Sequence, residues 1–200
     1  MEDTSSRQTR DRILHTAAEL FGQQGYSGVS MRRIADACEM KAGSLYYHFG
    51  SKDEILSEVL NLGISKVMAA VSQALDELPD TATAPEKLRA ALAGHLRALL
   101  EYSVFTSANV RIFGQVPEVV RQANLDARRA YETLWDELLA GFHAGGALRA
   151  DVDPRSLRLM VIGALNATLE WFDPARGDVD GLAARYADVL SHGVFRREGE

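Results

Sequence analysis

The stretch Val29–Glu54, VSMRRIADACEMKAGSLYYHFGSKDE, contains two short helical patterns separated by a tight turn. Ser30 is placed to cap the first helix, which leaves Arg32, Arg33 and Asp36 facing solvent or a partner. The inward side of this helix carries Met31, Ile34, Ala35 and Cys38. Two helices joined in this way are typical of a helix-turn-helix that docks on DNA.

The second helix is expected from about residue 41 to residue 49, with Leu45 and Phe49 on one side. Its opposite side is polar and aromatic, and it carries Gly43, Ser44, Tyr47 and His48. Hydroxyl and imidazole groups suit phosphate oxygens and base edges, and the small Ala42 and Gly43 allow a close approach. We therefore expect this face to enter a groove of DNA.

A third helix is predicted to begin directly afterwards. Gly50 is expected to stop the second helix, and Ser51 followed by Glu54 forms a capping box that starts a long helix. This places Lys52 at the rim, where a DNA backbone would pass.

The segment from Gly25-Tyr26 to Leu56 resembles the DNA-binding domain of the TetR family of transcriptional repressors. The similarity lies in Ser30–Ala35 (SMRRIA), Gly43–Phe49 (GSLYYHF) and Ser51–Glu54 (SKDE), and it covers about the first quarter of the chain. The resemblance implies a DNA operator as partner. It also implies that the positions matching DNA contacts in the family are Ser30, Arg32, Lys41, Ala42, Gly43, Ser44, Tyr46, Tyr47, His48 and Lys52.

Each of these residues also has a purely structural interpretation. Tyr46 and Tyr47 could be packing aromatics, His48 a helix cap, and Arg32 and Arg33 part of a solvated face. The ordered set of caps, turn and polar face favours a DNA-binding module.

Composition sets the class of protein. The chain has 200 residues, 46% of them hydrophobic, which suffices for a packed core. We find no run near the roughly 18 apolar residues of a membrane span and no signal-like start, so we expect a cytoplasmic protein with no membrane partner. The single cysteine, Cys38, excludes an intramolecular disulfide, and five scattered histidines predict neither a metal site nor a cofactor.

Charge is unevenly distributed along the chain. The formal net charge is −6, yet residues 1–52 carry seven basic and six acidic side chains, so the acidity belongs to the later part. The DNA affinity of so weakly basic a domain depends on a few well-placed contacts and on the pairing of two such domains. Arg7, Arg10 and Arg12 are expected to form a basic arm before the first helix, although a solvated tail is an equal alternative.

The periodicity predicts an all-α fold. A three-helix helix-turn-helix domain over residues 1–52 is followed by a helical bundle over residues 53–200 that binds a ligand and forms a dimer. The helices are expected over residues 6–24, 51–78, 85–101, 106–113, 117–145, 153–172 and 179–195, with a linker over 79–85.

The last two predicted helices carry faces of small and apolar side chains, which we expect to pack against other helices. We expect two copies to pack through these helices as a four-helix bundle. Such a dimer would present its two reading helices, the predicted helices over residues 41–49 of each copy, to successive major grooves of a palindromic operator. Burial against the chain's own helices is the alternative. The residues assigned to this homodimer interface are Met160, Gly163, Ala164, Ala167, Leu182, Tyr186, Val189, Leu190 and Gly193.

Aromatic side chains mixed with polar ones predict an apolar pocket for a small-molecule effector on helices that the family uses as a ligand cavity. The segment Leu169–Pro174 (LEWFDP) is similar to family members that respond to acyl-coenzyme A thioesters, and Arg111 or Arg128 could meet a phosphate or carboxylate. An effector would shift the dimer towards a form that leaves DNA. The candidate pocket residues are Tyr102, Phe105, Asn109, Phe113, Arg128, Tyr131, Trp135, Asn166, Glu170 and Trp171.

The sequence argues against two other classes of protein, a helical enzyme and a helical adaptor. A helical enzyme lacks a nucleophile and base at a recognisable spacing, with Glu170 and His95 as lone candidates. A helical adaptor without DNA binding conflicts with the filled set of polar positions from Lys41 to Lys52.

Overall fold

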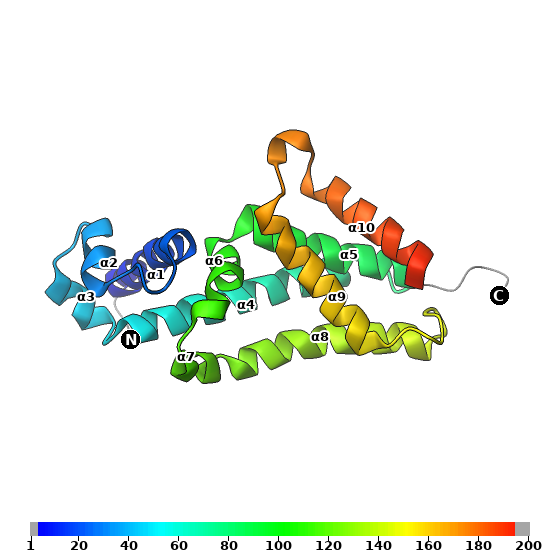
Figure 1. Cartoon of the computed structure of the whole chain (residues 1–200), viewed down its shortest axis with the longest axis horizontal. Helices are drawn as coiled ribbons and strands as arrows, with labels where there is room; N and C mark the ends of the chain where they lie inside the picture. Colours follow the sequence, from blue (N-terminus) through cyan, green and yellow to red (C-terminus); the bar gives the residue numbers. More distant parts are fainter. Residues whose placement is uncertain (1–3, 195–200) are drawn as a thin grey trace. The chain divides into compact units, whose positions relative to one another are not determined.

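A computed structural model describes residues 4–194, and the regular elements within that range are helices, as predicted (Figure 1). Short π-helical and 3-10 turns extend or link some of them: η1 (Ala98–Tyr102), η2 (Phe113–Gln115), η3 (Thr168–Glu170) and η4 (Pro174–Arg176). The α-helices are α1 (Thr4–Gln24), α2 (Met31–Ala37), α3 (Ala42–His48), α4 (Lys52–Asp76), α5 (Ala84–Arg97), α6 (Val104–Ile112), α7 (Glu118–Ala123), α8 (Leu125–Ala144), α9 (Pro154–Ala167) and α10 (Val179–Val194).

These helices form two compact units. Unit 1 contains residues up to 66 together with 103–128, and unit 2 contains 67–102 together with the chain from 129 onwards. The three helices predicted to bind DNA therefore share their unit with α6 and α7, which the sequence assigned to the effector domain.

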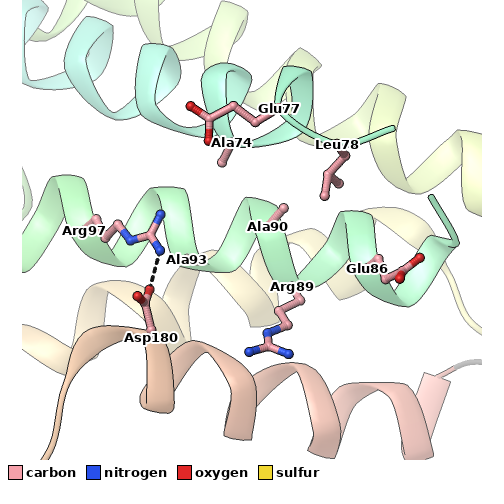
Figure 2. A pocket seen from close by; sticks show the side chains of 9 residues that line it. All are labelled: Ala74, Glu77, Leu78, Glu86, Arg89, Ala90, Ala93, Arg97 and Asp180. Carbon is pink, nitrogen blue, oxygen red and sulfur yellow. Dashed lines mark hydrogen bonds and ion pairs between the residues drawn. The ribbon is translucent and has the colours of Figure 1, made fainter. Parts of the chain in front are cut away.

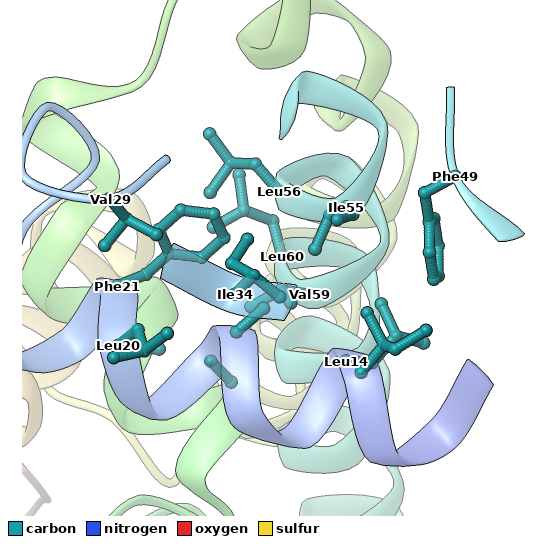
Figure 3. Close-up of a cluster of buried hydrophobic side chains, with 14 of the residues drawn as sticks. Leu14, Leu20, Phe21, Val29, Ile34, Phe49, Ile55, Leu56, Val59 and Leu60 are labelled. Carbon is teal, nitrogen blue, oxygen red and sulfur yellow. The ribbon is translucent and has the colours of Figure 1, made fainter. Parts of the chain in front are cut away.

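The core of unit 1 is built from the apolar stripes of α1 to α4 (Figure 3). Ile13, Phe21, Ile34 and Leu45 are fully buried in it, as the periodicity predicted. Cys38 is also buried and belongs to the same cluster. Burial of such side chains contributes about 1.5–3 kcal/mol each, so this core fixes α2 and α3 against α1 and α4.

Helix α6 packs closely on α1 and α4 within unit 1. A Cβ added at Gly63 of α4 would lie 2.5 Å from the Phe105 carbonyl oxygen, so only glycine permits this approach. Thr106 Oγ1 donates to the Gly63 carbonyl at 3.2 Å, and Asn109 Nδ2 donates to the Leu60 carbonyl at 2.8 Å. These bonds fix α6 in register along α4.

Unit 2 is organised around α5. Helix α10 packs along α5, and Arg97 at the end of α5 pairs with Asp180 at 2.5 Å. Gly94 allows close contact with the last part of α4, because a Cβ there would lie 2.6 Å from the Ala70 carbonyl oxygen. Between α8 and α9, the buried Arg158 pairs with Asp136 at 2.7 Å.

The single helix predicted over residues 117–145 is wrong, because the chain leaves helical geometry at Asn124 and forms α7 and α8. Asn124 is fully buried, and its Nδ2 donates to the Ser57 carbonyl and to Asn61 Oδ1 of α4 at 3.2 and 2.7 Å. Tertiary bonds to α4 therefore stabilise the break. Neither Pro nor Gly marks it in the sequence.

Two smaller predictions near the N-terminus are also corrected. Gly50 has no positive φ, and α3 ends instead where Phe49 becomes extended, with φ −141° and ψ 124°. Arg7, Arg10 and Arg12 lie inside α1 rather than in an arm before it.

Helix α4 is long and apolar enough to cross a membrane by length and composition alone, contrary to the expectation that no such stretch exists. However, 44% of its most apolar window is buried in the structure. Ile55, Leu56, Val59 and Leu60 pack against the other helices of unit 1. Helix α4 is therefore a core helix.

Candidate nucleic-acid interface and effector site

The turn between α2 and α3 is set by local bonds. Ser30 caps α2 as predicted, and its Oγ accepts from the Arg33 N–H at 3.1 Å. Glu39 lies in the left-handed region with φ 53°, and the Met40 N–H donates to the Ala35 carbonyl at 3.0 Å. The chain thus reverses within a few residues and delivers α3 onto the core.

Helix α3 has one buried and one exposed side. Leu45 and the following Phe49 are buried, whereas Tyr46 and Tyr47 are 55% and 83% exposed. Both tyrosines therefore lie outside the hydrophobic core, which argues against the packing interpretation. A Cβ added at Gly43 would meet no atom within 4 Å, so this face is open for a close partner.

The other predicted contacts from Ser30 to Ser44 are exposed at their positions in unit 1, and His48 is half-buried. The Arg32 guanidinium lies 3.9 Å from Asp36, but both side chains are largely exposed and such pairs exchange partners easily. Arg32 thus remains available for an anionic ligand.

Lys52 is engaged inside the protein. Its Nζ donates to the carbonyl oxygens of Tyr26 and Val29 at 3.0 and 2.8 Å and lies 3.7 Å from the centre of the Tyr26 ring. The Tyr26 hydroxyl donates to Asp53, and burial together with this carboxylate raises the pKa of Tyr26 to about 12. Lys52 therefore fastens the turn between α1 and α2 to the start of α4.

The capping box predicted for α4 is formed in part. Ser51 Oγ accepts from the Glu54 N–H at 3.1 Å, as expected. The Glu54 carboxylate accepts from the Gly50 N–H at 2.7 Å instead of from Ser51. Glu54 therefore secures the link between α3 and α4.

The candidate effector residues are divided between the two units. In unit 1, Asn109 is buried and Phe113 is half-buried. The Arg128 guanidinium carbon lies 3.3 Å from the Phe113 ring centre, and its Nη2 donates to Asn109 Oδ1 at 3.1 Å. Phe105 packs against α4 in the same unit. Asn109, Phe113 and Arg128 therefore form one polar and aromatic group.

In unit 2, Tyr131 and Asn166 meet at His95, which sequence reasoning considered only as a lone enzymatic candidate. Asn166 Oδ1 lies 3.2 Å from His95 Nε2, and the Tyr131 hydroxyl lies 2.6 Å from Nδ1. Because Oδ1 only accepts, Nε2 carries the ring proton and Nδ1 accepts from tyrosine. Burial lowers the pKa of His95 to about 4 and raises that of Tyr131.

The remaining candidates lie apart from this cluster or adjoin it. Trp135 is fully buried one helical turn from Tyr131, and its indole N–H has no hydrogen-bond partner among the described residues. Glu170 and Trp171 are exposed in the chain as described. The side chain of Tyr102 lies outside the described part.

A groove of about 450 Å³ opens on unit 2 between the end of α4, α5 and the start of α10 (Figure 2). Its walls combine Ala90 and Ala93 with the charged side chains of Arg89, Arg97 and Asp180. The predicted effector residues do not line this groove. It is therefore distinct from the pocket that the sequence predicted.

Most of the predicted dimer face is accessible. Met160 of α9 is 54% exposed and Val189 of α10 is 72% exposed. Gly163, Ala164, Ala167 and Gly193 are also exposed, while Tyr186 and Leu190 are half-buried. Leu182 is buried by other side chains of unit 2, so its predicted place in the dimer interface is corrected.

Family models match both parts of the chain. Residues 13–59 match the model of bacterial regulatory proteins of the tetR family. Residues 81–194 match a tetracyclin repressor-like C-terminal domain. Together these matches cover the helix-turn-helix and most of the helices that follow it.

Individual relatives are similar over almost their whole length. The transcriptional repressor KstR2 of Mycolicibacterium smegmatis is 28% identical, covering 96% of this chain and 93% of that protein. The regulator PfmR of Thermus thermophilus is 31% identical, with a TM-score of 0.79 over 94% of this chain and 98% of that chain. AibR, solved with isovaleryl coenzyme A and operator DNA, is 24% identical, with a TM-score of 0.78 over 94% and 98% of the chains.

Proposed function

The chain belongs to the TetR family of bacterial regulatory proteins, and from this membership we propose that it represses transcription by binding a palindromic operator as a homodimer. It is a DNA-binding regulator and not an enzyme. The observation that carries the proposal is the face of α3, where Tyr46 and Tyr47 stand exposed while Leu45 and Phe49 are anchored in the core.

The proposed DNA contacts are weighted by what each side chain does in unit 1. Ser44, Tyr46, Tyr47 and Lys41 lie on or next to α3 and face outwards, and Arg32 reaches from α2. We expect Lys52 to contribute less to DNA binding than these residues, because its ammonium group already donates to two carbonyl oxygens. We expect tyrosine and serine hydroxyls to reach base edges and phosphates, and arginine and lysine to neutralise phosphates.

The proposed dimer pairs the α9 and α10 faces of two copies. Exposed Met160 and Val189 supply apolar area, and the small residues Gly163 and Ala164 allow close backbone approach. Two-fold pairing would place two α3 helices on half-sites about one DNA turn apart. It would also compensate for the weak positive charge of each DNA-binding domain.

The proposed effector is an acyl-coenzyme A thioester or a similar lipid-like metabolite acting in the cytoplasm. Support comes from the LEWFDP segment at Leu169–Pro174 and from AibR, whose structure contains isovaleryl coenzyme A. Effector binding would favour a dimer whose reading helices no longer fit the operator, through movement of α4. Such coupling is typically ~1–3 kcal/mol, or about 5- to 150-fold in affinity.

The test is a gel-shift titration of the DNA flanking the encoding gene against a scrambled duplex of equal length and composition. We expect selective retardation of the flanking DNA, and its reversal by acyl-coenzyme A thioesters but not by free coenzyme A. Failure to distinguish the duplexes would contradict operator binding. Unchanged affinity across a panel of acyl chain lengths would reject this effector class.

A variant of the reading face gives the residue-level test. Tyr47→Ala removes a side chain that contributes little to the core, so we expect operator binding to weaken by about tenfold while thermal stability is unchanged. The matched control is Val119→Ala in α7, which removes another largely exposed side chain from unit 1. Wild-type affinity in Tyr47→Ala would remove Tyr47 from the interface.

A further inference from the structure

We propose that Arg10 of α1 is a positioning residue for DNA recognition, because it holds the C-terminal end of α3 and links that end to α4. The inference rests on the proposed role of α3 in reading DNA. This role of Arg10 follows neither from the exposed polar face of α3 nor from the similarity to the family. The residue acts through α3 and does not itself need to touch DNA.

The first contact of Arg10 is with the end of α3. Its Nη1 donates to the His48 carbonyl oxygen at 2.7 Å, and His48 is the last residue of that helix. Carbonyl groups in the last turn of a helix lack partners within the helix, so an outside donor fixes their position. The guanidinium carbon also lies 4.0 Å from the Phe49 ring centre, which adds a cation–π contact.

The second contact is with the first turns of α4. Arg10 Nη2 donates to Glu58, and the same nitrogen lies 4.0 Å from Glu54. The Arg10 and Glu58 side chains are only 29% and 34% exposed, so the pair is partly shielded from solvent. One planar group thus spans two helices, a geometry that a lysine ammonium on a flexible stem does not reproduce.

Arg10 adds a second link between α3 and α4, beside the backbone that joins them. Between α3 and α4 the backbone runs through Phe49, Gly50 and Ser51, which are not helical. Without Arg10, the end of α3 would be held by the Leu45 and Phe49 side chains and by the bond from the Gly50 N–H to Glu54. With Arg10, a displacement of α4 at Glu58 is transmitted directly to the backbone of the reading helix.

The alternative role of Arg10 is a direct phosphate contact, and Glu58→Ala separates the two by the sign of its effect. If Arg10 met phosphate, removing Glu58 would free the guanidinium and tighten binding to any duplex. If Arg10 positions α3, Glu58→Ala weakens binding to the retarded flanking duplex by about tenfold and leaves binding to the scrambled duplex unchanged or tighter. Glu19→Ala, which removes an exposed carboxylate from α1, is the charge-matched control.

Arg10→Lys completes the test because it keeps the positive charge but loses the planar guanidinium group, whose two terminal nitrogens donate to α3 and α4. We expect it to lower selectivity for the flanking duplex by about tenfold, with no further loss when Glu58→Ala is added. The control is Arg89→Lys on the exposed surface of α5. Thermal melts establish that each variant is folded, and a loss of folded protein would reduce binding to both duplexes equally.

The outcomes discriminate between the two proposals. If the wild-type protein does not prefer the flanking duplex, the proposed function fails before any variant is tested. If the wild type is selective and Glu58→Ala binds both duplexes more tightly, the positioning role is overturned. Unchanged selectivity in Arg10→Lys, or equal losses on both duplexes in a variant that the thermal melt shows to be folded, would also overturn it.

Discussion

Replacing Gly63 with alanine tests how closely α6 is attached to α4. The added Cβ would lie 2.5 Å from the Phe105 carbonyl oxygen, 2.9 Å from its carbonyl carbon and 3.1 Å from Asn109 Cβ. Two of these atoms belong to the backbone, so no side-chain rotation relieves the overlap. Helix α6 must move away from α4, and the bonds at the contact must stretch.

The magnitude follows from three contributions. Forcing a methyl group into a packed site costs about 1–3 kcal/mol. Weakening the bonds from Thr106 and Asn109 to the α4 carbonyls costs about 1 kcal/mol each. Alanine is favoured over glycine in a helix by about 1 kcal/mol, which offsets part of the loss. We expect Gly63→Ala to lower the free energy of unfolding by about 2–4 kcal/mol.

The assay is urea unfolding followed by circular dichroism at one fixed protein concentration, because association would make the midpoint concentration-dependent. The matched control is Gly141→Ala in α8, where the new Cβ meets no atom within 4 Å. The control should gain up to about 1 kcal/mol from helix propensity alone. If Gly63→Ala unfolds at the same urea concentration as Gly141→Ala, the close approach of α6 to α4 is wrong.

Further predictions concern unit 2. Because burial lowers the pKa of His95 from 6.5 to about 4, the unfolded chain binds more protons between those values, and the free energy of unfolding should fall by about 3 kcal/mol from pH 7 to pH 4. His95→Gln should remove this part of the pH dependence in urea titrations, and an identical profile in the variant would contradict the burial. Met160→Glu should place a charge in the proposed dimer face and shift sedimentation to the monomer. A variant that sediments as a wild-type dimer would move the interface elsewhere.

The helix-turn-helix could be predicted because its signals are local. Ser30 and Ser51 cap helices through the N–H groups three residues on, and Leu45 and Phe49 follow the period of their own helix. The partners of these groups lie nearby in sequence, so spacing alone identifies them. The exposure of Tyr47 follows from the burial of Leu45 by the same periodicity.

The contacts that sequence reasoning missed join residues far apart in the chain. Arg10 meets residues 38 and 48 positions away, and His95 meets Asn166 71 positions away. The sequence predicts Lys52 to contact DNA because it is charged and lies at the start of a helix. In the structure, however, its ammonium group donates to carbonyl groups 26 and 23 positions earlier. Polarity predicted that these groups need partners, but only tertiary packing decides which partner each receives.

The break at Asn124 shows how such partners bear on regulation within unit 1. Ser57 and Asn61 of α4 receive the Asn124 amide, and Leu60 and Gly63 receive Asn109 and Thr106 of α6. Apolar contacts tolerate sliding, whereas these directional bonds weaken steeply when either helix shifts. Segment 103–128 and the first half of α4 therefore move together or lose several hydrogen bonds at once. Because Glu58 lies within the same bonded stretch of α4, a displacement of this segment has a short path to Arg10 and the end of α3.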